Sequence, residues 1–96
     1  KQAVIGLELD GRFRAYPLAT LAKLPAGQAT DQFNGVDVFI DYLPDARTAY
    51  LSDAAGNALP TVTAYWFAWS ALHPGTDIFE TTPLKSAMSM MGALEE

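Results

Sequence analysis

Hydrophobic and polar residues alternate along much of residues 3–62, which is typical of strands that bury one face. Two dipeptides in this region, Asp10-Gly11 and Asn34-Gly35, are strong signals for tight hairpin turns. A polar segment at residues 53–57 marks a third turn, and residues 75–80 have the pattern of a last short strand. The pattern predicts a curved, mostly antiparallel sheet of about five or six strands. The strand after the second turn has one clearly apolar face, made of Val36, Val38, Ile40 and Tyr42.

The register of the first hairpin, over residues 3–17, can be set in two ways. A two-residue turn places Leu7 opposite Arg14, which mixes charge into the apolar face. A three-residue loop, with Gly11 in a bulge, places Leu7 opposite Phe13 instead. We favour the bulged loop, because a sheet with one buried face needs its apolar residues on the same side.

Two segments carry the period of helices. Residues 17–25 (PLATLAKLP) start with a proline suited to the first helical position and predict a short helix that ends before Pro25. Residues 61–75 (TVTAYWFAWSALHPG) predict a helix from Thr63 as N-cap to a stop at Pro74-Gly75. We expect its bulky side to lie on the sheet. Its small side should meet another element or another chain, and consists of Ala64, Ala68 and Ala71.

The last segment, residues 81–96, has apolar residues near helical spacing and predicts a C-terminal helix. As a chain end, it is the segment most prone to be mobile or exchanged between chains. Residues 1–96 together are predicted to form one α+β domain, in which the Trp-rich helix covers the sheet and the C-terminal helix packs nearby.

Composition narrows the function classes. The chain has 96 residues, a formal net charge of −5 and six Lys and Arg residues that are scattered singly. No basic stripe could neutralise several phosphates, which argues against nucleic acid and against an anionic membrane surface as partners. The absence of cysteine excludes disulfides and thiolate catalysis. No apolar run approaches the ~20 residues of a membrane span.

Three motifs carry a resemblance to a bacterial family. In chain order they are VIGLELDGRFRAYPL with its Arg-Ala-Tyr-Pro end, NGVDVFIDYLPDARTAY, and WFAWSALHPGTDIF with its His-Pro-Gly-Thr end. Over about residues 4–79 the chain resembles the domain of unknown function 3179 family. The resemblance implies an extracytoplasmic location, because members are commonly exported. It implies no activity, because the family has none established.

The middle motif departs from the family pattern. Members usually have a strand that ends in Tyr-Cys-Pro-x-Cys, where this chain has Leu43 and Ala46 around Pro44-Asp45. The histidine that often follows Arg-Ala-Tyr-Pro also has no counterpart. Metal or redox chemistry through those groups therefore cannot be carried over, and we expect no cofactor.

The aromatic run around Tyr65, Trp66 and Trp69 has two interpretations. The rings could stack a flat ligand or a cation. They could instead form the core, because buried aromatic side chains dominate small cores. We favour the core. As candidate ligand-binding residues we retain Tyr65, Trp66, Trp69, His73, Arg14 and Tyr16.

Three further groups have both a chemical and a structural interpretation. His73, the one histidine, could act as a base or metal ligand, but an imidazole beside the carbonyl end of a helix also has a structural role. Met88, Met90 and Met91 bring together thioethers that suit a soft cation such as Cu(I), yet methionine also fills cores. The aspartates could hold a hard cation, although solvated strand charges explain them more simply; they are Asp37, Asp41 and Asp45.

These features lead to three hypotheses. The first is a small non-catalytic extracytoplasmic module that binds a small ligand or a protein through the sheet surface or the flank of the Trp-rich helix. The second is an enzyme, or a metal-handling or redox-related protein, that uses His73 with the aspartates or with Met88, Met90 and Met91. The third is a homodimer through the Trp-rich helix or residues 81–96.

Overall fold

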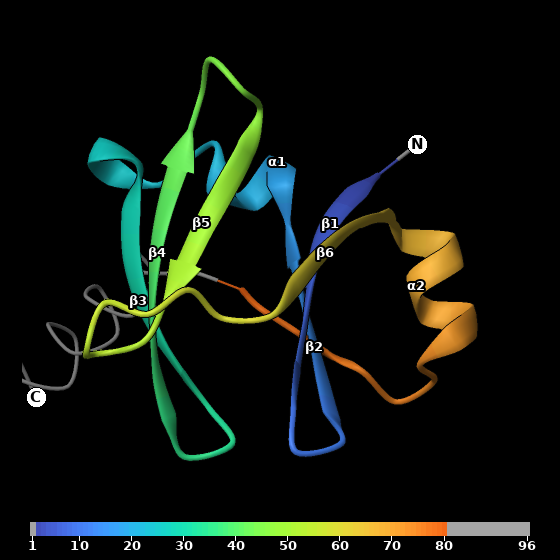
Figure 1. Cartoon of the computed structure of the whole chain (residues 1–96). Coiled ribbons are helices and arrows are strands. Elements are labelled where there is room, and N and C mark those ends of the chain that lie inside the picture. Colours follow the sequence, from blue (N-terminus) through green and yellow to red (C-terminus); the bar gives the residue numbers. More distant parts are fainter. Residues whose placement is uncertain (1, 81–96) are drawn as a thin grey trace, which may run out of the picture.

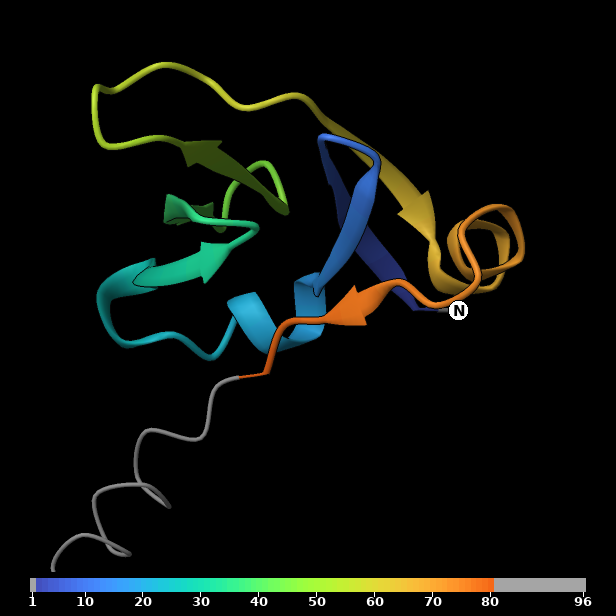
Figure 2. The same ribbon diagram turned by 90° about the horizontal axis from the view of Figure 1, so that it is seen from below.

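The computed structural model describes residues 2–80, which fold into three layers (Figures 1 and 2). Sheet A has the order β6-β1-β2-β7 and consists of β1 (Ala3–Leu9), β2 (Arg12–Pro17), β6 (Thr61–Tyr65) and β7 (Asp77–Ile78). Sheet B is the meander β3 (Gln28–Phe33), β4 (Val36–Leu43) and β5 (Thr48–Ser52). Between β2 and β3 lie α1 (Leu18–Leu21) and the 3-10 turn η1 (Pro25–Gly27). The helix α2 (Trp66–Leu72) packs on the side of sheet A that faces away from sheet B.

The α+β class is confirmed, but the described residues form two sheets of four and three strands in place of one sheet of five or six. The chain leaves sheet A after β2, builds sheet B, and returns as β6. Hairpin signals are local and predict which consecutive strands pair, whereas they do not show which hairpins share a sheet. The predicted C-terminal helix, residues 81–96, lies outside the described residues.

The first hairpin has the two-residue turn, and the bulged loop that we expected is wrong. Asp10 and Gly11 both have positive φ (53° and 78°), and Leu9 pairs with Arg12. The bulged register assumed that the hairpin buries one face, whereas sheet A is covered on both faces. Toward sheet B point Ile5, Leu7, Arg14 and Tyr16, and toward α2 point Val4, Gly6, Phe13 and Ala15.

The second hairpin is confirmed. Asn34 and Gly35 have positive φ (53° and 79°), and the predicted apolar face of β4 is turned toward sheet A, with Val38 and Ile40 buried. The Asn34 side-chain amide donates to the Leu9 carbonyl at 2.9 Å, which joins the ends of the two hairpins. The third predicted pair is reduced to one bridge, between Ser52 and Ala58, before the chain crosses to sheet A.

The predicted short helix over residues 17–25 is confirmed in the form of α1, which is four residues long and buries Leu21. The predicted start of the second helix at Thr63 is wrong. Residues 61–65 are a strand, β6, beside β1, and α2 begins only at Trp66. Three of these five residues are the β-branched Thr61, Val62 and Thr63, which favour a strand when a neighbouring strand offers hydrogen bonds.

Because α2 is short, it buries less of its bulky side than expected. Trp69 is 4% exposed, but Leu72 is 74% exposed and Tyr65, at the end of β6, is 49% exposed. The helix therefore covers sheet A through one indole ring and its immediate neighbours.

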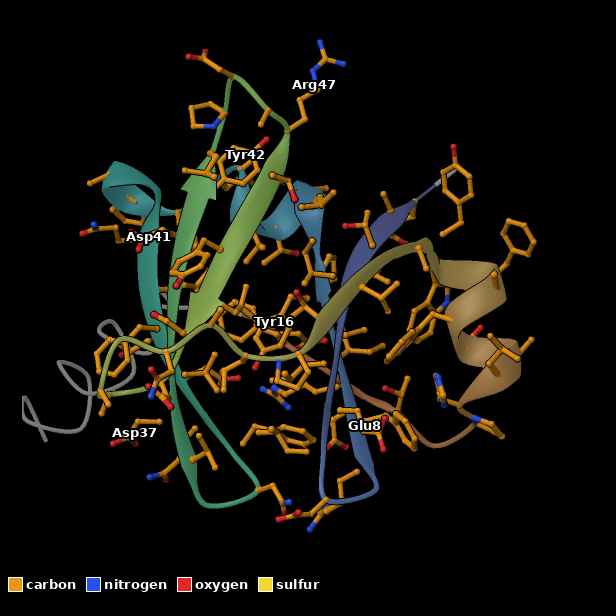
Figure 3. All side chains as sticks on the ribbon, in the orientation of Figure 1. Glu8, Tyr16, Asp37, Asp41, Tyr42 and Arg47 are labelled. Carbon is orange, nitrogen blue, oxygen red and sulfur yellow. The ribbon has the colours of Figure 1, made fainter. Side chains whose placement is uncertain are left out.

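The main core lies between the sheets and contains a charged pair. The Arg14 Nε–H of β2 donates to Asp31 Oδ2 of β3 at 2.7 Å, and the Tyr16 hydroxyl donates to the same oxygen at 2.8 Å. The guanidinium carbon of Arg14 also lies 5.8–5.9 Å from the ring centres of Tyr16, Phe33 and Phe79. Figure 3 shows Tyr16 in the space between the two sheets.

Burial, followed by the hydrogen bond to Asp31 and the negative charge of Asp31, raises the pKa of Tyr16 well above its ordinary value of 10.0. The phenol is protonated in the folded state at pH values where it ionises in the unfolded chain. The folded state therefore binds one proton more than the unfolded state above about pH 10.

Below about pH 10, we expect the ionisation of Tyr16 to have no effect on the free energy of unfolding. Above about pH 10, this ionisation should lower the free energy of unfolding by about 1.4 kcal/mol per pH unit. Urea unfolding between pH 8 and about pH 11.5 should show this fall in the wild type and lose it in Tyr16→Phe. Tyr50→Phe is the matched control, because Tyr50 is 44% exposed on sheet B. An identical slope in wild type and Tyr16→Phe would contradict the prediction.

Candidate ligand-binding site

An open hollow of about 480 Å³ lies on the outer face of sheet A, between the first hairpin, the start of β6 and the end of α2. Its size falls within the range of pockets for small ligands. It is lined by Gly6, Glu8, Asp10, Gly11, Phe13, Pro60, Thr61, Val62, Trp69 and His73.

Trp69 of α2 packs directly on the backbone of β1. A Cβ built on Gly6 would lie 2.3 Å from the Trp69 ring, so the indole occupies the place of a side chain at this position. The indole N–H donates to Thr76 Oγ1 at 3.0 Å, which fixes the ring from its other end. Glycine at position 6 is therefore what allows α2 to approach the sheet.

Phe13 and His73 extend this ring into an aromatic wall. Phe13 and His73 are stacked, with ring centres 3.9 Å apart and an angle of 18° between planes. His73 is tilted against Trp69 at 4.3 Å, and Phe13 meets Trp69 edge-on at 6.1 Å. Rings held on both sides in this way present a rigid surface to the hollow.

The charge on the hollow is negative. Glu8 lies opposite Phe13 in the hairpin, and Asp10 lies in its turn. Figure 3 shows Glu8 on the α2 side of the hairpin, away from Tyr16. Both acidic residues line the hollow, whereas no Lys or Arg within residues 2–80 does. The site combines aromatic surface with two carboxylates, neither of which forms an ion pair within residues 2–80.

The structure brings together two of the six candidate ligand-binding residues, Trp69 and His73, at this hollow. Trp66 is half-buried in the same cluster. Tyr65 stacks with Phe67, with ring centres 6.1 Å apart, and lines a different groove with Leu18 and Arg47. Arg14 and Tyr16 point to the other side of sheet A, where both bind Asp31.

The other eight lining residues were not predicted from the sequence, and three of them lie on the strands of the first hairpin: Gly6, Glu8 and Phe13. Their signal is the two-residue turn at Asp10-Gly11, because this register puts all three on one face. The bulged register that we favoured placed Phe13 on the face opposite to that of Gly6 and Glu8.

Of the residues in the metal hypotheses, only His73 lines the hollow; the others lie elsewhere or outside the described residues. Met88, Met90 and Met91 lie outside the described residues. Within residues 2–80, no group of three or more His, Cys, Asp or Glu side chains is arranged to hold a metal ion. Asp37 and Asp41 lie on the outer face of sheet B, where they accept hydrogen bonds from Gln32 at 3.2 Å and Gln28 at 2.9 Å. Asp45 lies in the exposed turn after β4.

In comparisons with known proteins, no family model, no curated protein and no solved structure matches this chain. The resemblance to the domain of unknown function 3179 family therefore stays a prediction based on its three motifs. Among the helices within residues 2–80, none has the length and apolar character needed to cross a membrane.

We expect Gly6→Ala to lower the free energy of unfolding by about 1–3 kcal/mol, because the new methyl group displaces the Trp69 ring. In a Trp69→Ala background the same change should be neutral or slightly stabilising, since alanine is better than glycine within a strand. Urea unfolding of the four proteins, followed by circular dichroism, gives the double-mutant cycle. If Gly6→Ala lowered the free energy of unfolding equally in both backgrounds, contact with the Trp69 ring would not be the reason for glycine at position 6.

Proposed function

We propose that this protein is a small non-catalytic binding module, and that the hollow beside Trp69 holds a ligand with a positive charge next to a flat apolar part. The observation that carries the proposal is the combination, in one hollow, of the aromatic wall and two carboxylates that form no ion pair within residues 2–80. Cations are attracted both to aromatic faces and to carboxylates, so the two features favour the same ligand.

The rigidity of the wall supports binding. Trp69 is held by Gly6 and Thr76, and Phe13 is held by His73, so little side-chain freedom remains to be lost when a ligand enters. A preformed apolar surface with few polar groups is typical of small-molecule sites.

The contacts of His73 support the non-catalytic part of the proposal. Its ring packs against Phe13 and Trp69, and among residues 2–80 no carboxylate accepts a hydrogen bond from it. A histidine base is normally oriented by such a partner. The proposed extracytoplasmic location depends on the family resemblance alone.

The test uses a Trp66→Phe protein, in which Trp69 is the remaining indole of the two in the chain. Benzylamine should quench Trp69 fluorescence saturably with a Kd on the order of millimolar, whereas benzoate, of the same shape and opposite charge, should not. Adding Glu8→Gln should weaken benzylamine binding at least about fivefold, because a charge-assisted contact is lost.

Asp37→Asn is the matched control, since Asp37 is an exposed carboxylate on the other sheet, and it should leave the affinity unchanged. Equal responses to benzylamine and benzoate, or no saturable response, would reject the hollow as a cation site. A stoichiometric fluorescence change with Cu(I), Zn²⁺ or Ca²⁺ would favour the metal-handling alternative that uses His73, Met88, Met90 and Met91.

A further inference from the structure

The strand β6 forms one edge of sheet A, and its outward backbone groups can be identified. The Trp66 N–H donates to the Gln2 carbonyl at 2.7 Å, and the pairing with β1 continues through Val4 with Ala64 and Gly6 with Val62. Hydrogen-bonded pairs alternate along an antiparallel ladder. Ala64 and Val62 therefore bond to β1, while the N–H and C=O groups of Thr61 and Thr63 point away from the sheet.

This edge lacks the features that normally prevent strands from pairing. The segment TVTAY contains no charged residue and no proline, pairs with β1 without a bulge, and is exposed at Thr61, Val62 and Thr63. Natural edge strands are usually shortened, charged, bulged or covered.

The other edges of the two sheets do carry such features. The β7 edge is only two residues long. The β3 edge has the inward-pointing charge of Asp31, which is paired with Arg14. The β5 edge is covered toward its end, where the Leu59 N–H donates to the Leu51 carbonyl at 2.9 Å and Ser52 bridges to Ala58. Within residues 2–80, β6 is thus the edge left open.

We propose that β6 pairs with β6 of a second copy of this chain, antiparallel and centred on Thr63, so that the two A sheets become one continuous sheet. Thr63 then exchanges two backbone hydrogen bonds with Thr63 of the second copy. This arrangement has the two-fold symmetry of most homodimers, in which both subunits contribute the same surface to the interface.

The absence of charge on β6 and its matching side chains favour a second copy as the occupant. The segment is neutral, so two copies meet at the seam without like charges opposite each other. Thr61, Thr63 and Tyr65 lie on one face of the strand, and threonine opposite threonine is a favourable cross-strand pair. Exposed apolar side chains flank the seam and would extend the contact: Val62 (54%), Tyr65 (49%) and Phe67 (66%).

The proposal does not depend on the function of the hollow, because it rests on the backbone of β6. The two features meet at Thr61 and Val62, which line the hollow and belong to the edge strand. The two proposals are still tested separately, because the benzylamine titration measures ligand binding and sedimentation measures association of the chain.

The test is sedimentation velocity of the full chain over a concentration series. The wild type should shift from monomer to dimer as concentration rises, and Thr63→Pro should raise the dimer dissociation constant at least about tenfold. Proline removes an N–H that points away from β1, so the variant keeps the ladder inside the monomer. Thr30→Pro is the matched control, because the N–H of Thr30 likewise points away from its neighbour, β4, at the β3 edge. This control should dimerise like the wild type.

Amide hydrogen exchange of the wild type provides a readout that needs no variant. The amides of Thr61 and Thr63 should exchange more slowly as the protein concentration rises, whereas that of Thr30 should not change. A chain that stays monomeric up to about 1 mM, a range in which even weak association is detected, would overturn the proposal. A dimer insensitive to Thr63→Pro, or one without protection at Thr61 and Thr63, would also overturn it.

Discussion

The ion pair between Arg14 and Asp31 joins the two sheets across the main core. Both charges point into the space between the sheets, and the Tyr16 hydroxyl donates to the carboxylate oxygen that Arg14 also binds. Removing one partner would leave the other charge partly buried and uncompensated, which is strongly unfavourable. A one-residue slip of β2 would have this effect, because it would turn Arg14 toward α2 and Phe13 toward sheet B. The pair therefore selects the register in addition to joining the layers.

The candidate site is a consequence of that register. Once Arg14 and Tyr16 face sheet B, alternation along the hairpin places Gly6, Glu8 and Phe13 on the opposite face. The indole of Trp69 can approach there because Gly6 has no side chain, and His73 then stacks on Phe13. The face of sheet A that is turned toward sheet B forms the main core, and the face that is turned toward α2 lines the hollow. A single hairpin thus contributes both to the core and to the lining of the candidate site.

Local signals in the sequence predicted the local structure well. Asp10-Gly11 and Asn34-Gly35 turn where expected, and the alternation from Val36 to Tyr42 gave the correct inner face of β4. Partners distant in sequence could not be predicted in the same way. Nothing near Arg14 indicates that its countercharge is Asp31, so we interpreted the arginine as a disturbance of an apolar face. Similarly, Thr61–Tyr65 becomes a strand because β1 lies beside it, and a helical interpretation of the isolated segment could not include that neighbour. Trp69 and His73 were identified as candidates from residue type alone. Glu8 and Phe13 could be identified only from the register of the first hairpin, which places them on the face of the hollow.

The position of β1 has a consequence for folding. Ala3 pairs with Tyr65, so the first strand that the structure describes is completed by nearly the last one. Before β6 joins the sheet, β1 has a partner on one side only, because β2 is its other neighbour. Sheet B, whose strands follow one another directly, has no such delay. Contacts between distant parts of a chain form slowly, because loop closure must come first. We therefore expect the pairing of β1 with β6 to form later than the local pairings within sheet B.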